Sequence, residues 1–175
     1  KRAFPQIKLV QLGGKNSPVY EEADFNLVGK TTLLDVPSLL QGAKAHIDTE
    51  SGLVQLAQYL DVKSVVIFGP TNREFFGYAK NINLAAGPCG GCMWSTPDWM
   101  FACPLGHKAA PCTEAVRAQD VLKALKKLLV PAKSRRPSAR GAVFPHNLCR
   151  TGTVVKRNIG HTGQTVFFQN FSFRF

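Results

Sequence analysis

Four cysteines lie within 24 residues of this 175-residue chain, and their spacing could hold a metal ion. They follow the pattern Cys-x2-Cys-x10-Cys-x8-Cys, at Cys89, Cys92, Cys103 and Cys112, inside a Cys-rich loop that we place at 88–112. Four thiolates suit tetrahedral zinc or iron, and such a closed site would be structural rather than catalytic. Two disulfides or buried free thiols would explain the same residues. We favour the metal, because four clustered cysteines with a Cys-x-x-Cys start are hard to explain by packing.

A second group of candidate residues lies where a predicted strand meets a predicted helix, in Asp48-Thr49-Glu50-Ser51-Gly52-Leu53-Val54-Gln55. In doubly wound sheets, ligands bind beyond the carboxyl ends of the strands, where a helix N-terminus offers backbone N–H groups to a phosphate. Ser51 and Gly52 would allow close approach of the backbone, and Glu50 could accept hydrogen bonds from a sugar hydroxyl. The simpler interpretation is helix capping by Ser51 or Thr49. On the pattern alone we favour capping, because capping serines are common.

The turn after the next predicted strand, Phe68-Gly69-Pro70-Thr71, could contribute to the same site. Gly69 and Pro70 suit a tight turn, and the hydroxyl of Thr71 could donate to a phosphate oxygen. An ordinary turn without a ligand explains these residues equally well. Because the two groups follow consecutive strands, the sequence predicts that they share a crevice.

Strands and helices alternate along the first 130 residues, which is typical of an α/β protein with a doubly wound, Rossmann-like parallel sheet flanked by helices. Apolar runs predict strands at 7–12, 45–48, 64–68 and 81–85, and helical spacing predicts helices at 32–40, 51–60 and 116–130. The run at 64–68 is continuously apolar apart from its first residue, as expected of a parallel strand covered on both faces.

The net charge of +11 is divided unevenly along the chain. Residues 1–130 carry 14 Lys and Arg against all 11 Asp and Glu, whereas residues 131–175 carry eight basic residues and no acidic one. A strongly basic chain suggests nucleic acid or an anionic membrane surface as a partner. Because the predicted domain itself is nearly neutral, we expect no nucleic-acid partner.

We expect residues 131–175 to form a basic tail outside the domain 1–130, either disordered or non-native. Residues 133–140 are rich in Pro, Ser and Arg, as in linkers. The last stretch, 165–175, alternates apolar and polar residues and could be a strand. It has no evident place in a sheet that the preceding helix already closes.

Several function classes are excluded by the sequence. No stretch approaches 18 consecutive apolar residues, so we expect no membrane span. The first residues show neither an initiator Met nor a signal peptide, and we interpret the chain as beginning inside a larger protein. Clustered rather than scattered cysteines favour a reducing compartment, so the cytoplasm is the expected location.

Residues 8 to about 130 resemble the C-terminal half of glycosyltransferase family nine, the ADP-heptose-dependent heptosyltransferases. The segments that carry the resemblance are Val10-Gln11-Leu12-Gly13-Gly14, Gly29-Lys30-Thr31-Thr32-Leu33, Glu50-Ser51-Gly52-Leu53-Val54-Gln55-Leu56-Ala57 and Val66-Ile67-Phe68-Gly69-Pro70-Thr71. The cysteine loop is similar to the four-cysteine iron motif of the autotransporter heptosyltransferase branch, which glycosylates serines of surface adhesins.

The resemblance implies a GT-B transferase in which this Rossmann-like half binds the ADP part of an ADP-sugar donor. The residues expected to bind the donor are Thr31, Glu50, Ser51, Gly52, Leu53, Gln55, Gly69 and Thr71. The family usually has Asp or a related acid where Glu50 stands, and His where Gln55 stands. Glutamine can still form hydrogen bonds but cannot carry a positive charge toward the donor.

The resemblance also implies that an N-terminal half, preceding Lys1, binds the acceptor and supplies the acidic general base. Inverting transfer needs such a base to deprotonate the attacking hydroxyl, and no residue of this chain is a candidate for it. We therefore expect the fragment to be inactive alone, and its parent to transfer heptose to a lipopolysaccharide core sugar or to an adhesin serine. The alternative is a non-catalytic, metal-stabilised remnant that serves homo-oligomerisation or partner binding.

Overall fold

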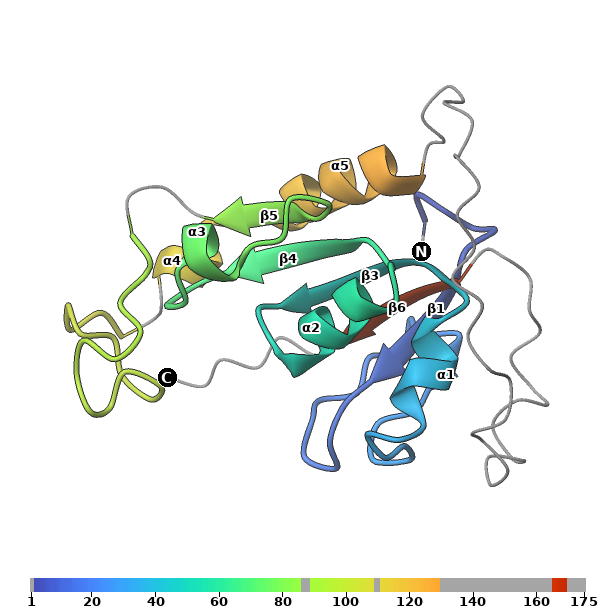
Figure 1. Cartoon of the computed structure of the whole chain (residues 1–175), viewed down its shortest axis with the longest axis horizontal. Helices are drawn as coiled ribbons and strands as arrows, with labels where there is room; N and C mark the ends of the chain where they lie inside the picture. Colours follow the sequence, from blue (N-terminus) through green and yellow to red (C-terminus); the bar gives the residue numbers. More distant parts are fainter. Residues whose placement is uncertain (1, 86–88, 109–110, 130–164, 170–175) are drawn as a thin grey trace.

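The computed structural model describes residues 2–85, 89–108, 111–129 and 165–169, which form an α/β structure around a parallel sheet (Figure 1). Within these residues the strand order is β2-β1-β6-β3-β4-β5, and every neighbouring pair is parallel. The strands are Lys8–Leu12 (β1), Phe25–Asn26 (β2), Ala43–Thr49 (β3), Ser64–Phe68 (β4), Ile82–Ala85 (β5) and Thr165–Gln169 (β6). The helices are Val36–Leu40 (α1), Gly52–Tyr59 (α2), Arg73–Phe76 (α3), Pro111–Glu114 (α4) and Ala118–Leu129 (α5).

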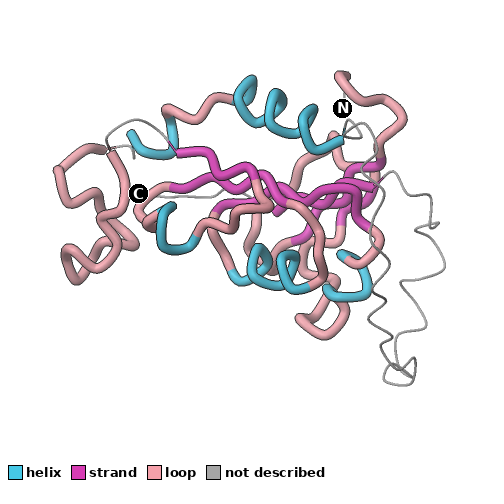
Figure 2. Tube along the Cα trace, turned by 45° about the horizontal axis from the view of Figure 1, so that its top comes forward, coloured by secondary structure: helices cyan, strands magenta, loops and turns pink. Residues whose placement is uncertain are grey.

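Helices cover both faces of the sheet, so that each face has its own hydrophobic core (Figure 2). Helices α1 and α2 pack on one face against Val10, Leu12 and Phe167. Helix α5 packs on the other face, where its Ala124 and Leu125 contact strand residues. This three-layer arrangement confirms the predicted Rossmann-like fold. Within the described part of the chain, no helix is long and apolar enough to cross a membrane.

The predicted strands at 7–12, 45–48, 64–68 and 81–85 are confirmed as β1, β3, β4 and β5, with shifts of one or two residues at their ends. The helix predicted from residue 32 begins only at Val36. Asp35 accepts hydrogen bonds from both the backbone N–H and the hydroxyl of Thr32, each 2.8 Å long, so residues 32–35 form a turn before the helix. The short elements β2, α3 and α4 were not predicted, because two to four residues are too few to show a period.

Strand β6 corrects our expectation that residues 131–175 lie outside the domain. It lies between β1 and β3, pairs in parallel with both, and buries Val166 and Phe167 on opposite faces of the sheet. The alternating pattern correctly suggested a strand, but a pattern within one segment does not reveal which distant strands it pairs with. The central sheet therefore includes residues 165–169 as well as strands from the predicted domain. The remaining residues of the expected tail, 131–164 and 170–175, lie outside the described residues.

Candidate functional site

The junction between β3 and α2 is closed by a serine cap. Helix α2 begins at Gly52, and Ser51 is its N-cap residue with an extended backbone. The Ser51 hydroxyl oxygen accepts hydrogen bonds from the backbone N–H groups of Leu53 and Val54, at 3.2 and 3.4 Å. The capping interpretation of Ser51 is therefore confirmed.

A buried carboxyl group lies directly beneath this cap. The Ser51 hydroxyl donates to Oδ2 of Asp48 at 2.5 Å, while Oδ1 of Asp48 accepts from the backbone N–H of Thr49 at 2.8 Å. Burial raises the pKa of Asp48 to about 7, although the hydrogen bonds from Ser51 and Thr49 oppose this shift. Asp48 can therefore gain or lose its proton near neutral pH.

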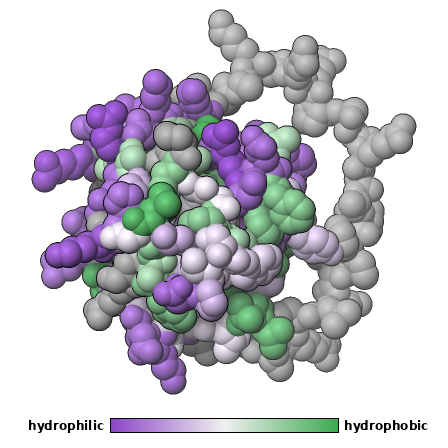
Figure 3. All heavy atoms as spheres, turned by 90° about the vertical axis from the view of Figure 1, so that its left-hand side faces the viewer, coloured by the Kyte–Doolittle hydropathy of each residue, from purple (hydrophilic) through white to green (hydrophobic). Residues whose placement is uncertain are grey.

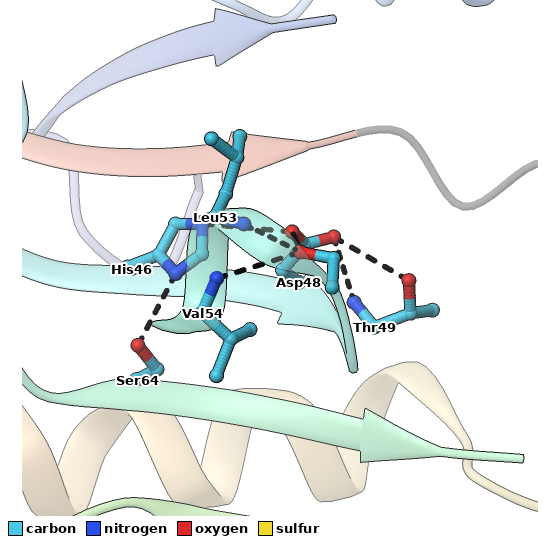
Figure 4. A network of polar contacts seen from close by, with 7 residues as sticks. His46, Asp48, Thr49, Leu53, Val54 and Ser64 are labelled. Carbon is cyan, nitrogen blue, oxygen red and sulfur yellow. Dashed lines mark hydrogen bonds and ion pairs between the residues drawn. The ribbon is translucent and has the colours of Figure 1, made fainter. Parts of the chain in front are cut away.

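A buried histidine lies beside Asp48 on the same face of β3 (Figure 4). The Nδ1 atom of His46 lies 3.1 Å from the hydroxyl oxygen of Ser64 on β4. Its Nε2 atom lies 3.8 Å from Oδ2 of Asp48 and has no hydrogen-bond partner among the residues that the structure describes. Burial lowers the pKa of His46 to about 4, so burial favours the neutral form of both side chains and opposes an ion pair between them. The sequence analysis did not single out His46, although two polar residues two positions apart share one face of a strand.

The side chains of Glu50 and Gln55 face each other across the first turns of α2. Nε2 of Gln55 donates to Oε1 of Glu50 at 3.3 Å, and the hydroxyl of Tyr78 donates to Oε1 of Gln55. All three side chains are half-buried. The predicted donor-binding residues from Glu50 to Gln55 thus form one group around the N-terminal half of α2.

The other predicted donor-binding residues lie elsewhere along the same edge of the sheet. Gly69 and Thr71 line a cavity of about 240 Å³ together with Cys89. The ends of β3 and β4 are linked because the backbone N–H of Glu50 donates to the carbonyl of Ile67 at 3.2 Å. Thr31 follows β2, and two strands, β1 and β6, separate β2 from β3 in the sheet.

The four cysteines of the predicted metal motif gather around one cavity. Cys89, Cys92, Cys103 and Cys112 all line a cavity of about 390 Å³, and no disulfide joins any two of these four. Burial raises the pKa of the Cys92 thiol, and the neighbouring thiols of Cys103 and Cys89 raise it further. Among the described residues, however, no three His, Cys, Asp or Glu side chains lie close enough together to hold a metal ion. The donors share a cavity without reaching coordination geometry.

Exposed hydrophobic side chains gather on the same segment. They are Trp94, Met100, Phe101 and Leu105, each at least 60% exposed. The rings of Trp94 and Trp99 meet edge to face, and Trp99 lines the cysteine cavity. Figure 3 views the molecule from the side that is on the left in Figure 1, where hydrophobic side chains lie among hydrophilic ones.

Comparisons with known proteins point to one family. The family model described as glycosyltransferase family 9 (heptosyltransferase) matches residues 14–107, just over half of the chain. Lipopolysaccharide heptosyltransferase 1 of Pseudomonas aeruginosa is 36% identical over 70 residues, which make up 38% of this chain and 20% of that protein. The match therefore spans about a fifth of the length of this relative. No solved structure gave a significant match.

Proposed function

This chain belongs to glycosyltransferase family 9, and from that premise we propose that the sheet edge where β3 ends binds the nucleotide-sugar donor of a glycosyl transfer reaction. The observation that carries the proposal is the arrangement of the α2 N-terminus at the carboxyl end of a parallel strand. In open α/β sheets this position favours phosphate groups, because the backbone N–H groups and the positive end of the helix dipole face the ligand.

The surroundings of Gly52 support close approach of a ligand. Gly52 is exposed, and a Cβ atom placed on it would meet no other atom within 4 Å. The packing of the protein therefore does not require a glycine here, whereas a phosphate lying against the backbone would. We propose that the donor diphosphate lies over Gly52 and Leu53 at the start of α2.

Glu50 and Gln55 would order the sugar or ribose of the donor. A carboxylate accepts hydrogen bonds from hydroxyl groups, and Gln55 is already held between Glu50 and Tyr78. Gly69 and Thr71, at the neighbouring strand end, would contact the adjacent part of the donor. Thr31 lies beyond the end of β2, a strand that is three strand spacings, or about 14 Å, from β3, so we propose that Thr31 contacts only an extended donor.

The donor we propose is ADP-heptose, since the matching relative is named as a heptosyltransferase. The proposed acceptor is a lipopolysaccharide core sugar, or an adhesin serine if the cysteine motif marks the autotransporter branch. Because the match spans about a fifth of that relative, we propose that acceptor binding and the general base belong to another part of the parent protein. The fragment alone would then bind donor without transferring its sugar.

We propose further that the four cysteines bind one structural zinc or iron ion. Four cysteine side chains around a single cavity support this, because soft thiolates are preferred ligands of both metals. The present distances do not fit an ion, so binding would have to draw the segment together. Elemental analysis of the purified chain should find one ion per chain, and Cys92→Ser should lose it. The chain has a fifth cysteine, Cys149, outside the motif, so metal-free protein with all five thiols freely titratable would contradict the proposal.

A non-catalytic role in homo-oligomerisation or partner binding is the second candidate function. The observation that favours it is the exposed hydrophobic group on the cysteine segment, because exposed apolar patches often mark protein contacts. Sedimentation of the full chain distinguishes this role: a Phe101→Ser chain should remain monomeric where the parent self-associates.

Calorimetric titration of the full chain with ADP and ADP-heptose tests the proposed donor site. We expect binding at about millimolar Kd or tighter for this partial site. Glu50→Ala should weaken binding severalfold, whereas Glu22→Ala, an exposed residue between β1 and β2, should leave it unchanged. Absence of binding by the chain without substitutions, called the parent chain in the comparisons of variants below, would contradict the proposed function.

A further inference from the structure

A buried polar pair on β3 has no role in the donor site proposed above. His46 and Asp48 are both almost completely buried, beneath the N-terminus of α2. Burying titratable groups is unfavourable unless their polar atoms find partners, and within the described part of the chain Nε2 of His46 has no hydrogen-bond partner. The unpartnered nitrogen faces Oδ2 of Asp48, the same oxygen that accepts the hydrogen bond from Ser51.

The proton on Asp48 decides which hydrogen bonds this group can form. When Asp48 is protonated, Oδ2–H can donate toward the free Nε2 of His46, with Nδ1–H of His46 donating to Ser64. When Asp48 is ionised, it only accepts, and it holds the Ser51 hydroxyl in a short, charge-assisted hydrogen bond. The protonation state of Asp48 therefore decides whether the Ser51 hydroxyl donates its hydrogen bond to Asp48.

Ser51 has a single hydroxyl proton, and two acceptors would compete for it. In the structure it is given to Asp48, while the Ser51 oxygen caps Leu53 and Val54. A phosphate at the start of α2 would need the same proton. An ionised Asp48 would also repel the phosphate through a poorly screened interior.

We propose that Asp48 is a positioning residue that couples proton uptake to anion binding at the N-terminus of α2. Protonated Asp48 turns toward His46 and releases the Ser51 hydroxyl to a donor phosphate. Ionised Asp48 keeps the hydroxyl and disfavours the phosphate. The inference rests on the proposed donor site, and it adds that the bound phosphates and the charge on Asp48 exclude each other.

The surroundings of Asp48 shift its protonation into the neutral pH range. Burial raises the pKa of Asp48 to about 7, and the nearby carboxylate of Glu50 raises it further. The other titratable group at Asp48 is His46, whose pKa is held at about 4 by burial, so it stays neutral near pH 7. Strand β4 places Val66 beside Asp48 in register, and β6 places Phe167 beside His46, and neither residue titrates.

The test measures ADP-heptose binding to the full chain by calorimetry between pH 6 and pH 8, in two buffers of different ionisation enthalpy. Each donor phosphate carries one ester bond and one anhydride bond, so its single negative charge is constant in this range and the ligand adds no pH dependence. We expect binding to weaken about tenfold from pH 6 to pH 8, because the protonated fraction of a group with a pKa of about 7 falls about tenfold over this range. Binding near pH 7 should take up a fraction of one proton.

Asp48→Asn keeps the shape of the protonated side chain but cannot ionise. It should bind at pH 8 as tightly as the parent binds at pH 6, with no pH dependence and no proton uptake. Asp61→Asn is the matched control, because Asp61 is exposed and pairs with Lys80 away from α2, and it should behave as the parent does. A merely structural role of Asp48 would instead weaken binding equally at every pH.

The outcomes separate this inference from the proposed function. Binding by the parent with equal affinity at pH 6 and pH 8 would overturn the coupling and leave the donor site standing. No binding at any pH would overturn the donor site and the coupling with it. Should Asp48→Asn fail to fold, proton uptake by the parent decides, and binding without uptake would overturn the inference.

Discussion

Strands β4 and β6 are both five residues long and both lie inside the same parallel sheet, with a neighbouring strand on each side, yet they reach it by different routes. β4 follows β3 through the single helix α2, and all five of its residues are buried. Residues 130–164 separate the end of α5 from the start of β6, which enters between β1 and β3. One strand is the local continuation of a β-α-β unit, and the other arrives from a distant part of the chain.

The difference shows that burial rather than closeness in sequence decides a strand's position. Lengthening a connection from about 14 to about 35 residues costs only about 0.8 kcal/mol in loop-closure entropy. Full burial of a single large apolar side chain contributes about 2 kcal/mol or more, and β6 buries both Val166 and Phe167. Burial of the β6 side chains therefore more than offsets the entropic cost of the long connection.

The two strands also supply different environments to the site. His46 on β3 lies in register with Ser64 on one side and with Phe167 on the other. β4 therefore offers His46 a hydrogen bond, while β6 offers an apolar cover that contributes to the desolvation of the imidazole.

The largest expected effect tests whether the two strands are equivalent in the core. Phe68 on β4 and Phe167 on β6 are both almost fully buried, so Phe68→Ala and Phe167→Ala should each lower the free energy of unfolding by about 3–5 kcal/mol. Chemical denaturation measures both. Phe75→Ala is the control, because its side chain is 80% exposed and should change stability by less than about 0.5 kcal/mol. A Phe167→Ala effect as small as the control would mean that β6 does not occupy the sheet.

The pH dependence of stability tests the buried pair that lies between the two strands. The raised pKa of Asp48 makes stability fall as pH rises from about 4 to about 7, because the folded chain retains a proton that the unfolded chain loses. The lowered pKa of His46 makes stability fall as pH drops from about 6.5 to about 4, because in this range the unfolded chain binds a proton that the folded chain does not bind. The two slopes oppose each other between about pH 4 and 6.5.

Single substitutions should separate the contributions of Asp48 and His46 to the pH dependence of stability. Relative to the parent, Asp48→Asn should gain stability with rising pH, whereas His46→Gln should lose it, by up to about 1.4 kcal/mol per pH unit. Urea denaturation at pH 4.5, 5.5 and 6.5 measures the differences. Identical pH profiles for the parent and both variants would show that neither group titrates differently in the folded chain.

A smaller effect on stability is expected from removing the N-cap of α2, the helix that connects β3 to β4. Ser51→Ala removes the cap of α2 and should lower stability by about 1 kcal/mol. Asn72→Ala is the matched comparison, because Asn72 caps α3 through Glu74 and Phe75 but none of the side chains of that helix is fully buried. The Asn72 variant should lose less. Equal losses would show that the cap acts only locally and not through the packing of α2.

The smallest expected effect compares how readily the two strands open. Because β6 returns through the longer connection, its amides should exchange with solvent at a free energy up to about 1 kcal/mol below that of the β4 amides. Native-state hydrogen exchange measures both strands in one sample. Equal protection would indicate that both strands open only on global unfolding.

Sequence patterns predicted the β3-α2-β4 unit because its signals are local. The apolar run at 64–68, the cap at Ser51 and the apolar spacing of α2 all lie within about twenty residues of one another. The cysteine spacing likewise predicted that four thiols would gather, and they line one cavity. Whether they reach coordination distance depends on a segment with little regular structure, whose path is set by tertiary contacts. The predicted crevice joining Ser51 to Thr71 depends on side-chain packing in the same way.

The sequence by itself determined the alternation of strands and helices, the cap of α2 and the donor groups that could bind a ligand. Periodicity and capping are properties of neighbouring residues, so they can be predicted from a single segment of the sequence. Only the tertiary structure decided that β6 lies between β1 and β3, and that His46 and Asp48 are enclosed beneath α2. Strand order and desolvation depend on which distant surfaces exclude water together. That dependence gives an ordinary histidine and aspartate their shifted pKa values, which no local pattern contains.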